Sequence, residues 1–337
     1  MPIETLITVP FAEHVLNRLE NISPKLSVTA LLPNRTEDIP AEIWARTEVL
    51  YAASVLPAPD LVPALRWVQF HFAGIDRHAE HPLLQQDNLL VTTLSGAAMS
   101  QMAEYALTMI LALGRKIPSL AASQKKAEWP KDRYDRFSPF ELRGKTVGIV
   151  GYGSIGRQIA RLLQPFGATV LATKQDAKRP QDTGYTIEGL GDPQGDFVRR
   201  LYPPQALQSM LRECHFVVIT VPLTTQTRSM IDAKALSAIK PGAYLVDISR
   251  GGVVEHAALL DALKSNKLAG AALDVFPEEP LPASSPFWQM PNVIVTPHIS
   301  GSSPYYEERA AELFAENLHR YLGGLQLYNL FDRHRGY

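Results

Sequence analysis

A glycine-rich hexapeptide at residues 151–156, Gly-Tyr-Gly-Ser-Ile-Gly, constrains the fold of this chain more than any other feature. The apolar run at residues 146–150 predicts a buried strand before it, and residues 157–163 follow it with apolar side chains at helical spacing. Alone, the pattern G-x-G-x-x-G is typical of many glycine-rich turns. Between a strand and a helix it indicates a dinucleotide site, because that is the setting the motif requires.

Each glycine of the hexapeptide has its own physical role in such a site. Gly151 permits the tight turn, Gly153 lets the backbone approach a pyrophosphate, and Gly156 allows the helix to pack closely on the strand. The free N–H groups and the positive dipole end of the helix then hold the phosphates. The sequence therefore predicts a redox cofactor whose contacts include Gly151, Gly153, Ser154, Ile155 and Gly156.

The bulk properties narrow the class of protein. A chain of 337 residues is long enough for two domains of ordinary size. The formal net charge of -1 gives no attraction to nucleic acid or to an acidic membrane, and we expect neither as a partner. The single cysteine, Cys214, excludes a disulfide framework and a cysteine metal cluster. We see no signal peptide and no uncharged stretch as long as a membrane span, so we expect a cytoplasmic protein.

Residues 1 to about 100 alternate short apolar runs with polar or proline-rich breaks, which predicts an α/β segment with its own core. Helical periodicity is strong over residues 99–113, and we interpret the charged and aromatic residues 115–143 as a linker. From residue 144 the pattern is strand then helix, repeated. Six apolar runs there predict a parallel sheet covered on both faces, with strands at residues 147–150, 169–172, 216–219, 243–247, 270–273 and 293–296.

Two segments stand outside this alternation. Residues 175–202 are rich in Gly, Pro, Asp and Arg, and we interpret them as an extended surface loop that is too polar for a core. The last helix, expected over residues 305–322, follows six strands that already complete a sheet, so it returns to the first domain. We predict a Rossmann-type doubly wound parallel sheet at residues 115–301, and a smaller discontinuous flavodoxin-like α/β substrate domain at residues 1–114 and 302–337.

Three polar residues follow three successive late strands of the predicted sheet. They are Arg250, Glu279 and His298. Ligands bind beyond the carboxyl ends of the strands in an open parallel sheet, so we expect all three to line one edge of a cleft. Each residue has an ordinary alternative: Arg250 as a helix cap or surface ion pair, Glu279 as part of a solvated loop, and His298 as a structural turn histidine.

The chemistry of a nicotinamide reaction needs these three residue types together. A carbonyl that accepts a hydride needs a proton donor, and histidine titrates near neutral pH. The imidazolium needs an orienting carboxylate, which Glu279 can supply. A 2-oxo acid needs a guanidinium that binds its carboxylate and carbonyl oxygens together. The combination favours one shared functional site over three separate structural roles.

Five spaced motifs make the chain resemble the D-2-hydroxyacid dehydrogenase family. Besides the hexapeptide they are Val-Pro-Leu-Thr-Thr-Gln-Thr at residues 221–227, Ser-Arg-Gly-Gly-Val-Val at 249–254, Asp-Val-Phe-Pro-Glu-Glu-Pro at 274–280 and Thr-Pro-His-Ile at 296–299. The N-terminal part matches more loosely, through residues 72–76 and 102–105. The similar formate dehydrogenase branch carries glutamine where Glu279 stands and needs no proton relay, so Glu279 indicates a hydroxy acid.

The resemblance implies a role for each matching residue. Arg250 binds the substrate, His298 is the acid/base, and Glu279 is the partner of His298. Backbone N–H groups near Ala73 and Gly74 hold the substrate carboxylate. The remaining expected cofactor contacts are Val221, Pro222 and Thr227, Ile248 just before the motif at 249–254, and Asp274 through the nicotinamide carboxamide.

The choice between NAD and NADP depends on the residue that follows the second strand. An NAD enzyme has an acid there, about 20 residues past the glycine motif, to bond the ribose 2′-hydroxyl. This chain has Lys174 at that point, with Lys178 and Arg179 nearby. These cations attract a 2′-phosphate; the alternative is that Asp176 serves the ribose and the lysines are merely solvated. We expect NAD(P) as the cofactor and favour NADP.

The predicted function is hydride transfer between NAD(P)H and a small 2-oxo acid or D-2-hydroxy acid. The acid enters between the domains, and protonated His298 gives its proton to the alkoxide that develops at C2. Relatives pair through the nucleotide domain, so we expect a homodimer. Two alternatives stay open: a nucleotide-sensing, corepressor-like binding protein, and a family member with another acceptor such as phosphite.

Overall fold

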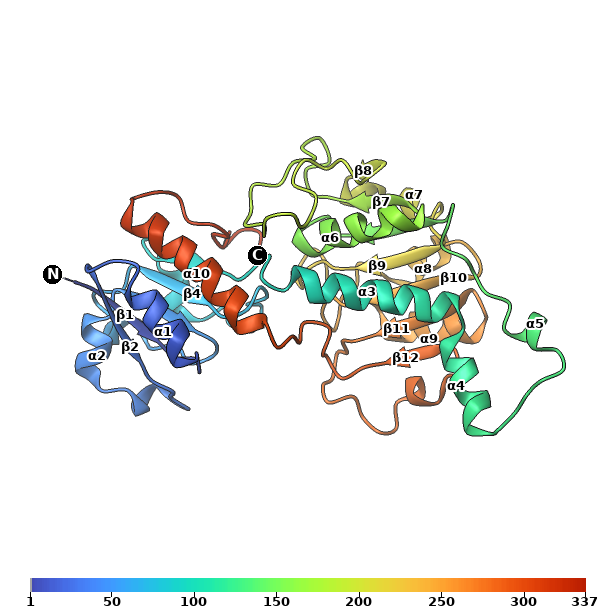
Figure 1. Ribbon diagram of the computed structural model, residues 1–337, viewed down its shortest axis with the longest axis horizontal. Coiled ribbons are helices and arrows are strands. Elements are labelled where there is room, and N and C mark those ends of the chain that lie inside the picture. The colour runs from blue at the N-terminus through green and yellow to red at the C-terminus, as the bar shows by residue number, and fades with distance from the viewer. Residues whose placement is uncertain (1) are drawn as a thin grey trace. The chain divides into compact units, whose positions relative to one another are not determined.

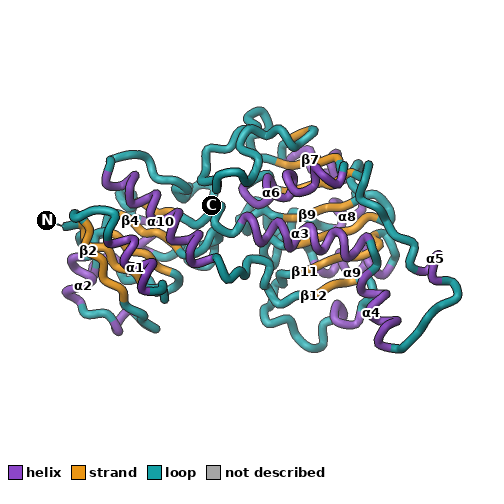
Figure 2. Tube along the Cα trace, viewed as in Figure 1, coloured by secondary structure: helices purple, strands orange, loops and turns teal. Residues whose placement is uncertain are grey.

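The computed structural model describes residues 2–337, which divide into two compact units. The first unit runs to Ala98 and resumes at Ser303, and the second is Met99–Ser302 (Figure 1). Each unit is built on one parallel sheet with helices against it (Figure 2). The predicted fold class is confirmed, since both units are parallel-sheet α/β domains and the first is discontinuous in sequence.

The first unit holds a five-stranded sheet in the order β2-β1-β3-β4-β5, which is the flavodoxin-like order. Its helices are α1 (Glu13–Glu20), α2 (Ala41–Arg46) and α10 (Tyr306–Leu322). Phe314 of α10 packs on buried strands, with its ring centroid 4.7 Å from that of Tyr51 and 5.4 Å from that of Trp67. The strands are β1 (Ile3–Ile7), β2 (Leu26–Ala30), β3 (Val49–Ala52), β4 (Trp67–Phe70) and β5 (Leu90–Thr92).

The second unit holds a seven-stranded sheet in the order β12-β11-β10-β9-β6-β7-β8. Counted from β6, this is the Rossmann order with one further strand, β12, at an edge, and the order reverses between β6 and β9. The strands are β6 (Thr146–Val150), β7 (Thr169–Thr173), β8 (Arg200–Tyr202), β9 (Phe216–Ile219), β10 (Ala243–Asp247), β11 (Leu268–Leu273) and β12 (Val293–Val295). On one face lie α3 (Met99–Gly114) and α6 (Ser154–Leu163), and on the other lie α7 (Leu207–Leu211), α8 (Ala233–Ala238) and α9 (His256–Lys264) (Figure 1).

Three features differ from the sequence expectation. Helix α3 packs on α6, β10 and β11 and so belongs to the second unit, whereas the sequence assigned residues up to 114 to the first domain. Residues 115–143 are more than a linker, because α4 (Ile117–Lys125) and α5 (Arg133–Arg136) form within them. The sheet has seven strands instead of six, because the polar stretch 175–202 ends in β8, which pairs with β7 and is too short to show a pattern. None of the helices in residues 2–337 is long and apolar enough to cross a membrane.

Candidate active site

The glycine-rich turn lies where β6 ends and α6 begins, beside the point where the strand order reverses. Gly151 has φ +108°, which favours glycine, and a Cβ on Gly156 would lie only 2.3 Å from the carbonyl oxygen of Gly151. Around Gly153, no described residue except its chain neighbours comes within 4 Å of an added Cβ, so that face of the turn is open. Ser154 and Ile155 begin α6, whose first N–H groups have no acceptor within the helix. The turn therefore fits a pyrophosphate group.

The loop after β9 lies against this turn. A Cβ on Gly151 would come 2.8 Å from Cγ1 of Val221. The hydroxyl of Thr227 donates to the carbonyl of Pro222 (2.6 Å) and accepts the N–H of Thr224 (2.8 Å), which closes the loop on itself. Val221, Pro222 and Thr227 are thus held in one ordered loop beside the glycines, and their contact with a cofactor stays a prediction.

Arg250 lies in the turn after β10, and its Nη1 donates to the carbonyl of Ser249 (2.9 Å). A Cβ on the next residue, Gly251, would lie 1.9 Å from the carbonyl oxygen of Phe276. Only glycine lets the turn press so closely against the segment that follows β11. That segment carries Glu279, so the backbone brings the turns of Arg250 and Glu279 together.

Glu279 and His298 contact each other directly. Nδ1 of His298 lies 2.9 Å from Oε2 of Glu279, and Oε1 of Glu279 accepts the N–H of Phe276 (2.9 Å). His298 has φ +53°, in the left-handed region that few residues other than glycine adopt, and its side chain is 41% exposed. His298 is thus held in a sparsely populated backbone conformation, bonded to a carboxylate and open to solvent. These three properties suit a histidine that exchanges a proton with a ligand.

A fully buried carboxylate, Asp274, holds the turn that carries His298. Its Oδ1 accepts the N–H of Ile299 (2.9 Å) and the hydroxyl of Thr296 (2.6 Å), and its Oδ2 accepts the N–H of Ser300 (2.9 Å). Sequence reasoning missed this structural role, although the motifs contain both Asp274 and Thr296. The expected bond from Asp274 to the nicotinamide carboxamide is neither supported nor contradicted by these contacts.

A second buried carboxyl group, Asp247, lies at the end of β10. Its Oδ1 accepts both the N–H (3.0 Å) and the hydroxyl (2.5 Å) of Ser249, the residue before Arg250. Burial raises the pKa of Asp247 to about 7, against the Ser249 hydrogen bonds that lower it, and Asp274 adds a smaller rise. Ile248, an expected cofactor contact, is buried beside it. Sequence reasoning missed Asp247, because a single Asp at a strand end carries no signal of its own.

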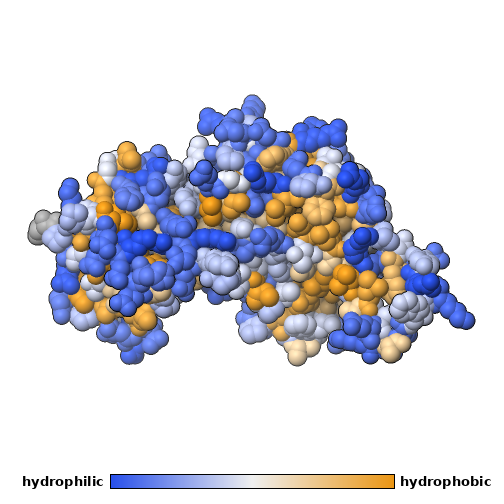
Figure 3. Space-filling view, in the orientation of Figure 1, coloured by the Kyte–Doolittle hydropathy of each residue, from blue (hydrophilic) through white to orange (hydrophobic). Residues whose placement is uncertain are grey.

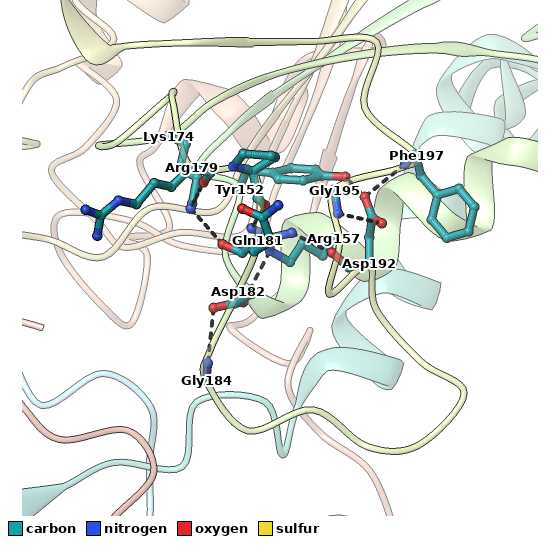
Figure 4. A network of polar contacts seen from close by, with 12 residues as sticks. Tyr152, Arg157, Lys174, Arg179, Gln181, Asp182, Gly184, Asp192, Gly195 and Phe197 are labelled. Atoms are coloured by element: carbon teal, nitrogen blue, oxygen red, sulfur yellow. Dashed lines mark hydrogen bonds and ion pairs between the residues drawn. The ribbon is translucent and has the colours of Figure 1, made fainter. Parts of the chain in front are cut away.

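Lys174 directly follows β7, and its ammonium turns onto the chain that comes next (Figure 4). Nζ donates to the carbonyl of Arg179 and to that of Gln181 (2.9 Å). Burial lowers the pKa of Lys174, and the Arg157 charge adds to this effect. Asp176, the alternative ribose acceptor, forms an ion pair with Arg179 (3.4 Å). Lys174 therefore organises the following loop, and its contact with a cofactor stays a prediction.

Ala73 and Gly74 belong to the first unit, on the loop after β4. That loop begins at His71, whose Nδ1 lies 2.8 Å from the hydroxyl of Tyr51. Burial lowers the pKa of His71 to about 4, so this histidine is neutral at physiological pH. The predicted binding of a substrate carboxylate by Ala73 and Gly74 stays an expectation from the sequence.

Comparison with known proteins identifies the family. The model of the D-isomer specific 2-hydroxyacid dehydrogenase NAD binding domain matches residues 107–300. The glyoxylate reductase of Thermofilum pendens is 33% identical over 308 residues, which are 91% of this chain and 81% of that protein. The D-3-phosphoglycerate dehydrogenase of Mycobacterium tuberculosis is 32% identical over 282 residues, 84% of this chain, which spans only 49% of that relative's length. A D-isomer specific 2-hydroxyacid dehydrogenase from Xanthobacter autotrophicus, solved in complex with NADPH and MES, covers 100% of both chains with a TM-score of 0.81 and 28% identity.

The matched region contains every predicted site residue of the second unit. It begins within α3 and ends just after the turn of His298, so it spans the glycine-rich turn and the turns of Arg250 and Glu279. The seven parallel strands in Rossmann order are those of a nucleotide-binding domain. This chain therefore belongs to the D-isomer specific 2-hydroxyacid dehydrogenase family, and it is an NAD(P)-dependent oxidoreductase that acts on 2-oxo or 2-hydroxy acids.

Proposed function

We propose that this enzyme reduces a small 2-oxo acid to the 2-hydroxy acid, of D configuration where the product is chiral, with glyoxylate and hydroxypyruvate as the first candidates. The observation that carries the proposal is the 2.9 Å contact between His298 Nδ1 and Glu279 Oε2, on the segments that follow the adjacent strands β11 and β12. The similarity to the glyoxylate reductase of Thermofilum pendens supports this class of substrate.

In this proposal His298 is the proton donor and Glu279 positions it. The carboxylate bonded to Nδ1 fixes the tautomer and orientation of the ring, which leaves Nε2 to give a proton to the oxygen at C2 of the substrate. In the reverse direction Nε2 accepts that proton. The N–H of Phe276 holds the other oxygen of Glu279, so the carboxylate keeps its orientation through both steps.

Arg250 is the proposed substrate-binding residue. Its guanidinium presents paired N–H donors that match a carboxylate oxygen and the neighbouring carbonyl oxygen. The close approach of Gly251 to Phe276 restricts the backbone from which Arg250 projects. Ala73 and Gly74 are proposed to add backbone N–H donors to the same carboxylate.

A bound nicotinamide cofactor supplies the hydride for this reaction. We infer that it is NADP, because β7 is followed by Lys174 instead of an acid, with Lys178 and Arg179 close behind. The NADPH complex of the similar Xanthobacter autotrophicus enzyme supports this choice. The residues proposed to hold the cofactor are Gly151, Gly153, Ser154, Ile155, Gly156, Val221, Pro222, Thr227, Ile248 and Asp274.

Steady-state turnover tests the proposed function. We expect the highest kcat/KM with NADPH and one of the two small acids when glyoxylate, hydroxypyruvate and phenylpyruvate are each paired with NADPH and NADH. Loss of the reduced-nicotinamide absorbance is the measurement. His319→Ala, on the exposed side of α10, is the control for substitutions of His298. Tight binding of NADPH without turnover of any acid would contradict the proposal.

We also propose that two copies of the chain pair through the second unit, with residues 115–143 in the interface. Trp129 and Tyr134 are 84% and 78% exposed, and Ile117 and Leu120 of α4 are exposed as well. Apolar side chains also gather over α3 and beside it (Figure 3). Light scattering should give a dimer mass for the parent and a monomer mass for Leu120→Ser combined with Trp129→Ser. A dimer mass for that variant would place the interface elsewhere.

A further inference from the structure

The polar segment that leaves β7, residues 174–199, is organised by buried groups, and we call it the β7–β8 loop. None of these residues is in a helix or strand, yet Asp192 is only 2% exposed. The carboxylate of Asp192 accepts three successive N–H groups, of residues 195–197, at 2.8 to 3.1 Å. It also accepts the hydroxyl of Tyr152 at 2.5 Å. Asp192 therefore ties the loop to the second residue of the glycine-rich turn (Figure 4).

Arg157 lies on the first turn of α6 and is 1% exposed. Its side chain holds the β7–β8 loop at two separate points, Pro180 and Asp192. Nη1 donates to the carbonyl of Asp192 and Nη2 to that of Pro180 (2.6 Å). Nε lies 3.2 Å from Oδ2 of Asp182, close enough for an ion pair though not aligned for a hydrogen bond. The guanidinium also lies over the ring of Tyr152, 4.7 Å from its centroid. We call Tyr152, Arg157 and Asp192 the loop anchor.

A buried polar cluster of this kind is not by itself evidence of added stability. Apolar packing of similar volume stabilises a fold as well or better, whereas buried polar groups specify one conformation in the best-attested cases. Burial and the hydrogen bond to Asp192 raise the pKa of Tyr152, so its hydroxyl remains a donor across the neutral range. The loop anchor thus holds one arrangement of the chain next to the turn that fits the pyrophosphate.

The β7–β8 loop carries its cations close to the end of β7, where the ribose of a dinucleotide lies in this type of sheet. Lys174 is turned inward, onto the carbonyls of Arg179 and Gln181. Lys178 is exposed, and the Arg179 side chain is 84% exposed with its guanidinium pointing away from the network (Figure 4). The bonds of Lys174 to Arg179 and Gln181 and the bond from Arg157 to Pro180 fix the backbone at Arg179 and at the two residues that follow it.

We propose that the loop anchor positions Lys178 and Arg179 for the 2′-phosphate of NADP, and that Lys174 acts inside the loop as a further positioning residue. The inference rests on the proposed preference for NADP. In this proposal the exposed side chains of Lys178 and Arg179 bind the phosphate. The ammonium of Lys174 points into the loop and holds its backbone.

Two variants test the loop anchor with little change in shape. Tyr152→Phe removes one hydroxyl and keeps the ring beneath Arg157, and Asp192→Asn removes an acceptor of backbone N–H groups. Tyr202→Phe is the matched control, because the hydroxyl of Tyr202 donates to Glu213 (2.6 Å) in the same unit but outside the loop. The measurements are hydrogen exchange of residues 192–199 without cofactor, dissociation constants of NADPH and NADH by fluorescence titration, and kcat at saturating cofactor.

We expect faster exchange in both variants and a dissociation constant for NADPH that is raised by about tenfold, the scale of one lost hydrogen bond to a charged group. In both variants the dissociation constant for NADH and the value of kcat should stay unchanged. In the Tyr202→Phe control, hydrogen exchange, both dissociation constants and kcat should match those of the parent. Unchanged exchange, unchanged NADPH binding, or an equal loss for NADPH and NADH would each overturn the inference. Tighter binding of NADH than of NADPH by the parent enzyme would refute the cofactor proposal itself, whatever the exchange shows. If Tyr152→Phe does not fold, Asp182→Asn at the edge of the same cluster repeats the test.

Discussion

Asp274 and Asp192 are both buried carboxylates in the second unit. Each stabilises a segment that is neither helix nor strand, but their surroundings differ. Asp274 directly follows β11, in a region where turns also meet backbone to backbone, as Gly251 meets Phe276. Asp192 lies in the middle of the β7–β8 loop, which α6 and the glycine-rich turn hold through side chains.

The contrast lies in what restricts each segment. We call the turns after β10, β11 and β12 the catalytic turns: the close backbone approach of Gly251 to Phe276 restricts the first two, and the buried side chain of Asp274 holds the third. The β7–β8 loop depends on a few side chains, so single substitutions can reshape it. We therefore expect single substitutions of the loop anchor to change the β7–β8 loop and to leave the catalytic turns in place.

The largest expected effect lies in the catalytic turns. His298→Ala should lower kcat by about 10²–10⁴, the usual contribution of a general acid, and leave the dissociation constant of NADPH nearly unchanged. Asp192→Asn should do the reverse, with normal kcat and weakened NADPH binding. Turnover and titration of both variants check this, and near-normal turnover of His298→Ala would remove His298 from the chemistry.

Asp247 predicts a pH dependence of stability. Its folded-state pKa of about 7 lies above the ordinary value of 3.8, so between these values the folded state holds a proton that the unfolded chain has lost. The stabilisation by Asp247 is therefore complete below about pH 4 and is lost as the pH rises through about 7. Asp247→Asn cannot ionise and should gain stability relative to the parent over this range, by roughly 4 kcal/mol at most. Urea unfolding at several pH values measures the difference, and a constant difference would refute the assignment.

Asp274→Asn and Asp192→Asn should separate global from local stabilisation. The amide at residue 274 loses part of its capacity to accept the N–H groups of Ile299 and Ser300, which should lower the free energy of unfolding by about 2 kcal/mol. The same change at residue 192 should mainly speed up hydrogen exchange within the β7–β8 loop, because local opening of a loop requires less free energy than global unfolding. Equal losses in urea unfolding would show that both segments belong to one cooperative core.

The smallest expected effect concerns Lys174. Lys174→Asp removes the bonds that hold the carbonyls of Arg179 and Gln181, so it should raise the KM for NADPH by about fivefold at most, or about 1 kcal/mol, the scale of one partly exposed charge, and it should spare NADH. Lys234→Asp, at an exposed position of α8, is the matched control. An unchanged ratio of the two KM values would remove Lys174 from cofactor recognition.

Much of the fold was accessible from the sequence because strands, turns and their order depend on local patterns. The runs that became β6, β7, β9, β10, β11 and β12 were all recognised, and this placed Arg250, Glu279 and His298 after neighbouring strands. β8 was missed, since three residues within a polar stretch show no periodicity. The assignment of α3 to the first domain differed from the structure, because periodicity defines a helix but not the sheet on which it packs.

By itself the sequence determined the family, the two parallel sheets and the turns on which the proposed catalytic residues stand. Only the tertiary structure decided that Asp192 and Arg157 are buried and that the β7–β8 loop is ordered around them. The physical reason is distance along the chain: Tyr152 and Asp192 are 40 residues apart, and Arg157 and Asp192 are 35 apart. A charged residue in a polar stretch looks solvated until its partners are known, and those partners are supplied by the packing of remote segments.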